Sequence, residues 1–337
     1  MKILVTGGAG FIGSNFIRYV LSKYPEDFVI NFDKLTYAGN LENLKDVEEN
    51  LHYKFYKGDI CDPIAIEKAL GLVDSVDAII NFAAESHVDR SILSAGAFVQ
   101  TDVYGTYVLL EAVKRFRIKR YIHISTDEVY GSIEKGSFTE ESPLSPNSPY
   151  AASKAGGDLL VRSYIKTHDL PAIITRSSNN YGPYQYPEKL IPLFITNALQ
   201  GQRLPLYGDG KNVRDWLYVE DNCEAIDAVL RKGKLGEIYN IAGESEKKNI
   251  EITKFILKDL GLTDELIEPV KDRPAHDRRY SIECEKAKKL GWAPKTSLDD
   301  GLRKTIIWYQ SNREWWGRIK ERQKDFQKFY ADWYGKK

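Results

Sequence analysis

KILVTGGAGFIG, residues 2–13, joins a short apolar run to a glycine-rich turn and then to the start of an amphipathic segment. From Gly8 it satisfies the pattern G-x-G-x-x-G, and from Gly7 it satisfies G-x-x-G-x-x-G. Glycines at these positions allow a tight turn and let the backbone approach a pyrophosphate, which rests at the N-terminus of the following helix. The stretch therefore predicts the first strand and helix of a dinucleotide-binding sheet. The alternative is a glycine-rich turn without a ligand.

Short apolar runs and longer amphipathic runs alternate from this stretch to about residue 180. The expected strands are Lys2–Thr6, Phe28–Asp33, Tyr53–Lys57, Ala78–Phe82, Arg120–Ser125 and Ala172–Ser178. The expected helices are Phe11–Lys23, Pro63–Leu70, Ala95–Phe116 and Tyr150–His168. Because the first strands are continuous apolar runs, we expect parallel strands covered on both faces. The predicted fold class is α/β, with a doubly wound parallel Rossmann sheet.

The pattern changes after residue 180, where prolines interrupt it. We expect residues 1–180 to form the dinucleotide-binding domain, with later returns near 214–243 that include a strand at Glu237–Ile241. Residues 181–337 should form mainly a smaller, C-terminal substrate-binding lobe and a helical tail. In this tail, from Ser297 onward, we expect the many aromatic side chains to pack onto the domain.

Composition narrows the class of protein. The chain has 337 residues, with 48 basic and 48 acidic side chains, so no general attraction to nucleic acid or to an anionic membrane is expected. The three cysteines, Cys61, Cys223 and Cys284, have no metal-binding spacing, which favours a reducing compartment and no metal site. We find no signal peptide and no membrane-spanning run, so we expect a cytoplasmic protein.

An acidic residue ends the second expected strand. Asp33 lies 20 residues after Gly13, where a carboxylate can accept hydrogen bonds from both ribose hydroxyls and repels a 2′-phosphate. NAD is therefore favoured over NADP, although Lys34 could pair with such a phosphate. Asp59 and Ile60 should meet the adenine, and the residues after the fourth strand should run beside the cofactor.

Tyr150 and Lys154 are four residues apart in an expected helix, so both side chains lie on one face. A nearby ammonium and a positive nicotinamide should lower the pKa of the phenol. Tyr150 could then act as the base that deprotonates an alcohol while hydride leaves for NAD. The alternative is an amphipathic surface helix without a catalytic role.

STDEVYG, Ser125–Gly131, places two adjacent acids after the fifth expected strand. Neighbouring strand residues point to opposite faces, so Asp127 and Glu128 can act on one substrate only if the strand ends in a turn. Two close carboxyls in a poorly hydrated site do not both ionise readily, so one should keep a proton. The alternative is that the pair only caps the following turn.

Together these motifs resemble those of the extended short-chain dehydrogenase/reductase family, over essentially the whole chain. STDEVYG is similar to the signature of those members that dehydrate dTDP-glucose to dTDP-4-keto-6-deoxyglucose in deoxysugar biosynthesis. The resemblance implies oxidation at C4 by NAD with Tyr150 as base, and Thr126 bonded to the C4 oxygen. It implies Glu128 as the base at C5, Asp127 as the acid at the C6 hydroxyl, and return of the hydride to C6.

Other functions stay open at this point. The donor could be another nucleotide-glucose, or the chain could be a 4-epimerase or decarboxylase of the same family, against which Asp127 beside Glu128 argues. A catalytically idle NAD-binding scaffold is the non-enzyme alternative, against which the intact set of reactive side chains argues.

The resemblance also implies contact residues and a partner. Cofactor contacts are expected at Gly7, Gly10, Phe11, Ile12, Gly13, Asp33, Lys34, Leu35, Thr36, Asp59, Ile60, Phe82, Ala83, Ala84, Glu85, Thr101, Tyr150, Lys154 and Asn179. Substrate contacts are expected at Ser86, Thr126, Asn180, Lys189, Leu190, Pro205, Tyr207, Arg214, Asn249, Asp272, Arg273 and His276. Relatives pair through two helices each, here Ala95–Phe116 and Tyr150–His168, which implies a homodimer through a four-helix bundle. We interpret His87, His123 and His168 as structural.

Overall fold

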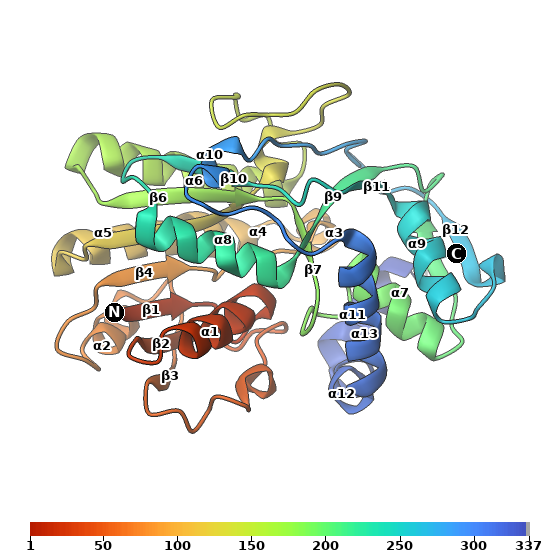
Figure 1. The fold of residues 1–337 in the computed structure, drawn as a ribbon, viewed down its shortest axis with the longest axis horizontal. Coiled ribbons are helices and arrows are strands. Elements are labelled where there is room, and N and C mark those ends of the chain that lie inside the picture. Colours follow the sequence, from red (N-terminus) through yellow and green to blue (C-terminus); the bar gives the residue numbers. More distant parts are fainter. Residues whose placement is uncertain (335–337) are drawn as a thin grey trace.

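The computed structural model describes residues 1–334, and its largest element is a sheet of seven strands (Figure 1). The order is β10-β6-β5-β4-β1-β2-β3, and every neighbouring pair is parallel. The bounds are β1 Lys2–Thr6, β2 Phe28–Asp33, β3 Tyr53–Lys57, β4 Ala78–Asn81, β5 Arg120–Thr126, β6 Ala172–Ser177 and β10 Ile238–Ile241. The predicted strands are confirmed, with no boundary of the first six off by more than one residue. The order reverses between β1 and β4, where ligands bind in such sheets.

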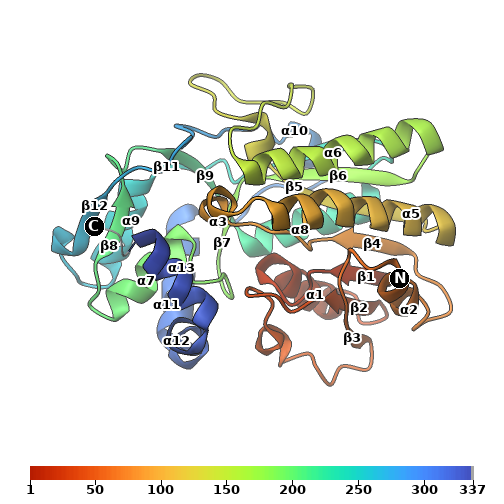
Figure 2. The same cartoon turned by 180° about the vertical axis from the view of Figure 1, so that it is seen from behind.

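Helices cover both faces of this sheet (Figures 1 and 2). On one face lie α1 (Phe11–Lys23) and α8 (Val219–Lys232), and on the other lie α2 (Pro63–Leu70), α5 (Thr106–Phe116) and α6 (Pro149–His168). Ser148 caps α6, since its hydroxyl accepts from the backbone N–H of Ala151 at 3.1 Å. The predicted doubly wound arrangement is therefore confirmed.

The expected continuous helix at Ala95–Phe116 is wrong in one respect. The segment divides into α4 (Gly96–Phe98), a π-helical stretch (η2, Val99–Gly105) and α5. The wider turn carries Asp102, which is 2% exposed and contacts the two neighbouring segments. Its carboxylate accepts from the backbone N–H of Glu85 at 3.1 Å and from the Ser153 hydroxyl at 2.7 Å. An apolar pattern with helical periodicity does not reveal this local change of hydrogen bonding.

A smaller lobe lies beyond the carboxyl ends of the parallel strands (Figure 1). It contains a three-stranded sheet in the order β11-β9-β7 and a two-stranded sheet of β12 and β8. The bounds are β7 Asn179–Tyr181, β8 Leu204–Tyr207, β9 Val213–Tyr218, β11 Glu246–Lys248, β12 Ile267–Val270, α7 Leu190–Leu199 and α9 Asn249–Asp259. Between β9 and β11 the chain returns to the large domain, where α8 covers one face of the sheet and β10 is its edge strand. We propose that the domain boundary lies at residue 180 and that the chain later returns to the large domain through α8 and β10.

Short elements complete the described chain. They are α3 (Val88–Leu93), α10 (Glu285–Lys288) and the 3₁₀ helices η1 (Leu41–Leu44), η3 (Asp127–Tyr130) and η4 (Asp264–Leu266). Within residues 1–334, no helix is both long enough and apolar enough to cross a membrane.

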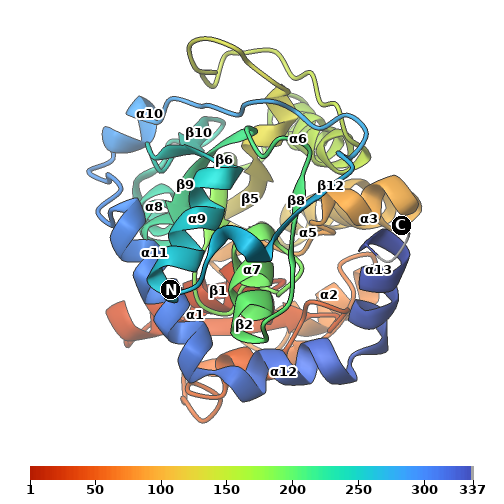
Figure 3. The same cartoon turned by 90° about the vertical axis from the view of Figure 1, so that its right-hand side faces the viewer.

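The tail forms α11 (Leu298–Ser311), α12 (Arg313–Arg322) and α13 (Lys324–Tyr334) along the lobe (Figure 3). Tyr309, Trp315 and Trp316 are buried in the core of the lobe, so the predicted aromatic packing is confirmed. The Trp315 indole also donates to Asn43 Oδ1 at 2.9 Å, which ties the tail to the large domain. Residues 335–337 of the predicted lobe lie outside the described residues.

Candidate active site

The glycine-rich turn forms one wall of a cavity of about 390 Å³ at the switch point of the sheet. Gly7 has φ +68°, and a Cβ at this position would lie 2.5 Å from the backbone nitrogen of Ala83. Only glycine therefore allows β1 and the segment after β4 to come this close. Gly10 precedes α1 in extended conformation, so the free N–H groups of the first helical turn are available to a phosphate.

Asp33 sits at the end of β2 and lines the same cavity. Its two carboxylate oxygens accept from the backbone N–H groups of Ala9 at 2.9 Å and Leu35 at 2.7 Å. Burial raises the pKa of Asp33 despite these bonds. Lys34, the residue that argued for a 2′-phosphate, is paired with Asp59 at 2.7 Å. This ion pair weakens the case for NADP.

Most of the predicted cofactor contacts line this first cavity. They are Gly7, Gly10, Phe11, Ile12, Gly13, Asp33, Lys34, Thr36, Asp59, Ile60, Phe82, Ala83, Ala84, Glu85, Thr101, Tyr150 and Lys154. Two expectations differ from the structure. Leu35 is not among the lining residues, because its backbone turns with φ +57° to bond Asp33, and Asn179 lines a second cavity instead. Ser86, which we assigned to the substrate, lines the first cavity.

Tyr150 and Lys154 lie on one face of α6, as predicted, and both line the first cavity. The Lys154 ammonium donates to the carbonyl of Ile124 at 2.7 Å. In the protein alone, burial, followed by the charges of Glu128 and Asp102, raises the pKa of Tyr150 well above its ordinary value. The expected lowering includes the charge of the nicotinamide and stays a prediction.

The acid pair lies in the one-turn 3₁₀ helix η3, directly after β5 ends at Thr126. The strand does end before the pair, as predicted. Thr126 caps this turn, because its hydroxyl accepts from the backbone N–H of Glu128 at 3.3 Å. The carboxyls themselves therefore have no capping role here, and the alternative interpretation of the pair is wrong. Thr126 also donates to Asp127 Oδ1 at 3.2 Å.

The two carboxyls occupy different surroundings. Asp127 is 2% exposed, and burial, the charge of Glu128 and the charge of Asp215 raise its pKa well above the ordinary value. Glu128 lines a second cavity, and its Oε2 accepts from the Tyr280 hydroxyl at 3.4 Å. Burial thus favours the protonated form of Asp127, while Glu128 faces the space in which a substrate would lie.

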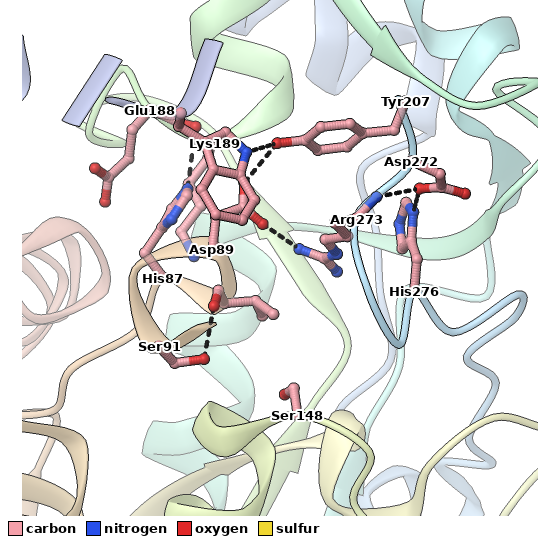
Figure 4. A network of polar contacts seen from close by, with 12 residues as sticks. His87, Asp89, Ser91, Ser148, Glu188, Lys189, Tyr207, Asp272, Arg273 and His276 are labelled. Carbon is pink, nitrogen blue, oxygen red and sulfur yellow. Dashed lines mark hydrogen bonds and ion pairs between the residues drawn. The ribbon is translucent and has the colours of Figure 1, made fainter. Parts of the chain in front are cut away.

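The second cavity, of about 150 Å³, opens between the sheet and the smaller lobe. Gln185, Glu188 and Lys189 line both cavities, so the two adjoin. Predicted substrate residues on its walls are Asn180, Lys189, Leu190, Pro205, Tyr207, Arg214, Asn249, Arg273 and His276. Thr126 and Asp272 line neither cavity, but Thr126 bonds the acid pair and Asp272 bonds the ring of His276 (Figure 4).

Charge in the second cavity is arranged around two arginines. Arg214 donates to the backbone carbonyls of Val213 at 2.7 Å and Asp277 at 3.0 Å, and its guanidinium lies 4.2 Å over the Tyr280 ring. Arg273 pairs with Asp89 at 2.9 Å. Burial and then these two guanidinium groups lower the pKa of His276 to about 4, so its imidazole is neutral at pH 7. Such a site favours an anionic, phosphate-bearing ligand.

The sequence analysis did not predict several residues of the cavity walls. Asp89 accepts from Tyr207 and from Arg273, and so joins α3 to two segments of the lobe (Figure 4). Glu188 pairs with Arg90 at 2.8 Å, and Tyr334 reaches the second cavity from α13. His87, interpreted as structural, is 5% exposed but also lines this cavity. No local motif marks these residues, because their proximity arises from packing between distant segments.

Comparison with known proteins identifies relatives whose names match this type of site. A family model described as GDP-mannose 4,6 dehydratase matches residues 4–305. The dTDP-glucose 4,6-dehydratase of Streptomyces niveus is 52% identical over 325 residues, which cover 95% of this chain and 96% of that protein. The structure of the same-named enzyme of Bacillus anthracis in complex with NAD has TM-score 0.89 and 53% identity, covering 95% and 99% of the two chains. DesIV of Streptomyces venezuelae, a dTDP-glucose 4,6-dehydratase solved with NAD and TYD bound, has TM-score 0.92 and 52% identity, covering 95% and 100%.

Proposed function

The chain belongs to the GDP-mannose 4,6-dehydratase family, within the extended short-chain dehydrogenases/reductases, and on this premise we propose that it converts dTDP-glucose to dTDP-4-keto-6-deoxyglucose. The observation that carries the proposal is the buried η3 turn, in which the Asp127 carboxyl is 2% exposed beside Glu128, which lines the second cavity. An alcohol oxidation alone needs neither group, whereas loss of water needs an acid and a base.

NAD is the cofactor, and the first cavity fits it. Gly7, Gly10 and Gly13 line the cavity without side chains that would keep a pyrophosphate from the backbone, and Asp33 supplies a carboxylate to the ribose hydroxyls. Bound there, NAD would supply a hydride acceptor for C4 of the sugar and, once reduced, a hydride donor for C6. Because the cycle is redox-neutral, we expect the purified protein to retain NAD. Nucleotide released by denaturation would test this, and release of NADP would contradict our interpretation of Asp33.

The oxidation step needs a base at the C4 hydroxyl. We assign this role to Tyr150, which lies in the wall of the cofactor cavity, with Lys154 as the cation that supports the phenolate. Thr126 would bond the C4 oxygen from the end of β5. Burial raises the pKa of Tyr150, and a positive charge beside the phenol would favour the phenolate.

The elimination step needs a second base and an acid. With a ketone at C4, the C5 proton becomes acidic, and the Glu128 carboxylate takes it. The Asp127 carboxylic acid gives its proton to the departing C6 hydroxyl, which leaves as water. Burial supports this division of roles, since it keeps the proton on Asp127.

The second cavity would hold the nucleoside diphosphate. Asn180, Arg214, Asn249, Arg273 and His276 supply donors and cations to the diphosphate and base, while Leu190, Pro205 and Tyr207 supply apolar walls. Replacement of Arg214 by alanine should raise KM by about 10–100-fold with a smaller change in kcat, because a charge-assisted contact to phosphate is lost. Arg278→Ala is the matched control, because Arg278 is an exposed neighbour paired with Asp209. Equal KM values for the two variants would contradict the assignment of Arg214.

We also propose a homodimer through η2, α5 and α6. Large apolar side chains are exposed along these helices: Val99, Tyr104, Tyr107 and Leu159. A four-helix arrangement of two copies would cover them. Sedimentation of the parent protein should give the mass of two chains, and Leu159→Glu should give the mass of one chain.

A cytoplasmic location remains our prediction from the sequence.

Incubation with dTDP-glucose, UDP-glucose, GDP-mannose and CDP-glucose, followed by mass spectrometry, tests the function. The expected product from dTDP-glucose has lost one water, and a deuterium label placed at C4 should appear at C6. Return of the label to C4 without loss of water would identify a 4-epimerase and overturn the proposal. Preference for UDP-glucose or CDP-glucose would change only the nucleoside of the donor, whereas preference for GDP-mannose would change the sugar as well.

A further inference from the structure

Behind the residues of the proposed mechanism lies a cluster of buried polar side chains that the mechanism does not use. Asp158 on α6 and Arg176 on β6 are 0% and 1% exposed. Arg176 Nε donates to Asp158 Oδ2 at 2.8 Å, and Arg176 Nη1 donates to the Tyr130 hydroxyl oxygen at 2.7 Å. The Tyr130 hydroxyl donates in turn to Asn240 Oδ1 at 2.8 Å. We call Asp158, Arg176 and Tyr130 the Arg176 network.

The two ends of the Arg176 network lie on α6 and η3. Helix α6 carries Tyr150 and Lys154, which we call the oxidation pair, and η3 carries Asp127 and Glu128, which we call the elimination pair. Asp158 follows Lys154 by four residues on α6, so it shares the face of the helix that carries Tyr150 and Lys154. Tyr130 is the last residue of η3, and Asp127 is the first. The guanidinium of Arg176 therefore connects the helix of the oxidation pair to the turn of the elimination pair.

The backbone of η3 makes three hydrogen bonds of its own. The Glu128 N–H donates to the Thr126 hydroxyl, the Gly131 N–H donates to the Glu128 carbonyl at 3.2 Å, and the Val129 carbonyl accepts from the Ser145 N–H at 3.0 Å. None of these three bonds reaches α6, whereas the Arg176 network does. Gly131, with φ +84°, then turns the chain away. In a 3₁₀ helix, residues three apart lie on the same side, so Asp127 and Tyr130 move together. The Tyr130 side chain thus anchors the far end of the turn.

Stability alone does not explain the network. Burial of an ion pair costs desolvation energy, and apolar side chains of similar volume often serve stability as well or better. Arg176 Nη2 also has no hydrogen-bond partner among the described residues. A planar guanidinium with donors in fixed directions is, however, well suited to hold two oxygens at a set separation.

We propose that Tyr130, Arg176 and Asp158 are positioning residues that set the place of the elimination pair relative to the oxidation pair. The inference rests on the proposed function. When the link is cut at Tyr130, η3 is released while α6 keeps its place, so oxidation proceeds and loss of water slows. The intermediate that accumulates is the 4-keto sugar with its C6 hydroxyl still attached.

Two variants remove contacts of the Arg176 network and leave the volume of the core nearly unchanged. Tyr130→Phe removes one hydroxyl and keeps the ring, which stacks on Phe138 with centroids 5.2 Å apart. Arg176→Lys keeps the charge beside Asp158 but loses the second donor direction. Tyr239→Phe is the matched control. Tyr239 lies on β10 and is 3% exposed, and its hydroxyl accepts from the backbone N–H of Lys234 at 2.9 Å, outside the Arg176 network.

With dTDP-glucose, both link variants should form water-loss product about 10–100-fold more slowly, the scale expected for a misplacement of roughly 1 Å, with KM within about twofold. Mass spectrometry of quenched reactions should show the keto sugar that retains water, and Tyr239→Phe should show none. A uniform slowing of both steps, or the same effect in Tyr239→Phe, would overturn the inference. If the parent protein releases no water from any donor, the proposed function fails instead.

Amide hydrogen exchange tests the positioning without any substrate. Peptides that contain Glu128 to Gly131 should exchange faster in Tyr130→Phe and Arg176→Lys than in the parent and in Tyr239→Phe. Unchanged exchange in this segment would overturn the inference whatever the substrate proves to be.

Discussion

The two reactive pairs of this protein are built on very different supports. Tyr150 and Lys154 stand on α6, a helix of 20 residues whose own hydrogen bonds fix their spacing. Asp127 and Glu128 are adjacent residues in η3, a single buried turn of four residues. A long helix positions a pair by local geometry, whereas a single turn depends on its surroundings. The elimination pair should therefore be the easier of the two to misplace by distant changes.

The pairs are also joined electrostatically. The charge of Glu128 is the largest cause, after burial, of the raised pKa of Tyr150. The oxidation pair therefore works against the field of the elimination pair, and each pair can be perturbed through the other. Four changes test how separate the two pairs are.

The largest effect is expected when both carboxyls of η3 are neutralised. Asp127→Asn with Glu128→Gln keeps shape and hydrogen-bonding groups but removes the acid and the base. Each such group typically contributes about 10²–10⁴-fold, so water-loss product should fall by at least about 10³-fold. Oxidation should continue, so reduced-nicotinamide absorbance and a keto sugar that retains water should accumulate. Loss of water at the parent rate would show that the pair has no role in elimination.

Loss of the phenol should stop the reaction one step earlier. Tyr150→Phe should lower turnover by about 10²–10⁴-fold with little change in KM, because affinity comes from the diphosphate and base. Rapid mixing with substrate should show no reduced-nicotinamide absorbance, in contrast to the double carboxyl variant. Tyr164→Phe, on the same helix but bonded to Glu111, is the control and should react normally. Near-normal turnover of Tyr150→Phe would reject the oxidation assignment.

A single charge removed from η3 should shift the pH dependence of oxidation. Glu128 is the largest cause, after burial, of the raised pKa of Tyr150, so Glu128→Gln should lower that pKa. More phenolate is then present at a given pH, and the limb of the pH profile for nicotinamide reduction should move to lower pH. Glu246→Gln, a carboxylate of the lobe paired with Arg279, should leave the limb in place. A limb that moves to higher pH would contradict the proposed coupling.

The smallest effect concerns Asp102, which accepts a hydrogen bond from Ser153 on α6, the helix of Tyr150 and Lys154. Burial raises the pKa of Asp102 to about 6, against an ordinary 3.8, so the folded protein binds this proton more tightly than the unfolded chain. Its contribution to stability therefore falls as pH rises from about 4 through 6. Asp102→Asn, which cannot ionise, should raise Tm by about 2–4 °C above pH 6 and give no gain below about pH 4.

Asp74→Asn serves as the control for this measurement, because the Asp74 side chain is exposed. Thermal melts of both variants across the same pH series, at equal NAD concentration, separate a burial effect from a general effect of lost charge. A gain for Asp102→Asn that is the same at all pH values would contradict the assigned pKa.

Much of the large domain was predictable because its signals are local. The strands from β1 to β6, helix α1 and the cradle at Gly7 follow from apolar runs, a glycine pattern and an acid at the end of β2. The spacing of Tyr150 and Lys154 and the turn after β5 follow in the same way. Each of these signals lies within a few residues of the feature it predicts.

Other features depend on contacts between residues far apart in the chain. The sequence by itself determined the order of elements and the identity of the reactive pairs. Only the tertiary structure decided the π-helical turn at Asp102, the place of Asp89, Glu188 and Tyr334 in the cavity walls, and the network through Arg176. It also showed that burial raises the pKa of Tyr150 in the protein alone. The physical reason is that backbone hydrogen bonding repeats over a few residues and leaves a periodic trace, whereas burial and charge fields sum over all segments packed around a site.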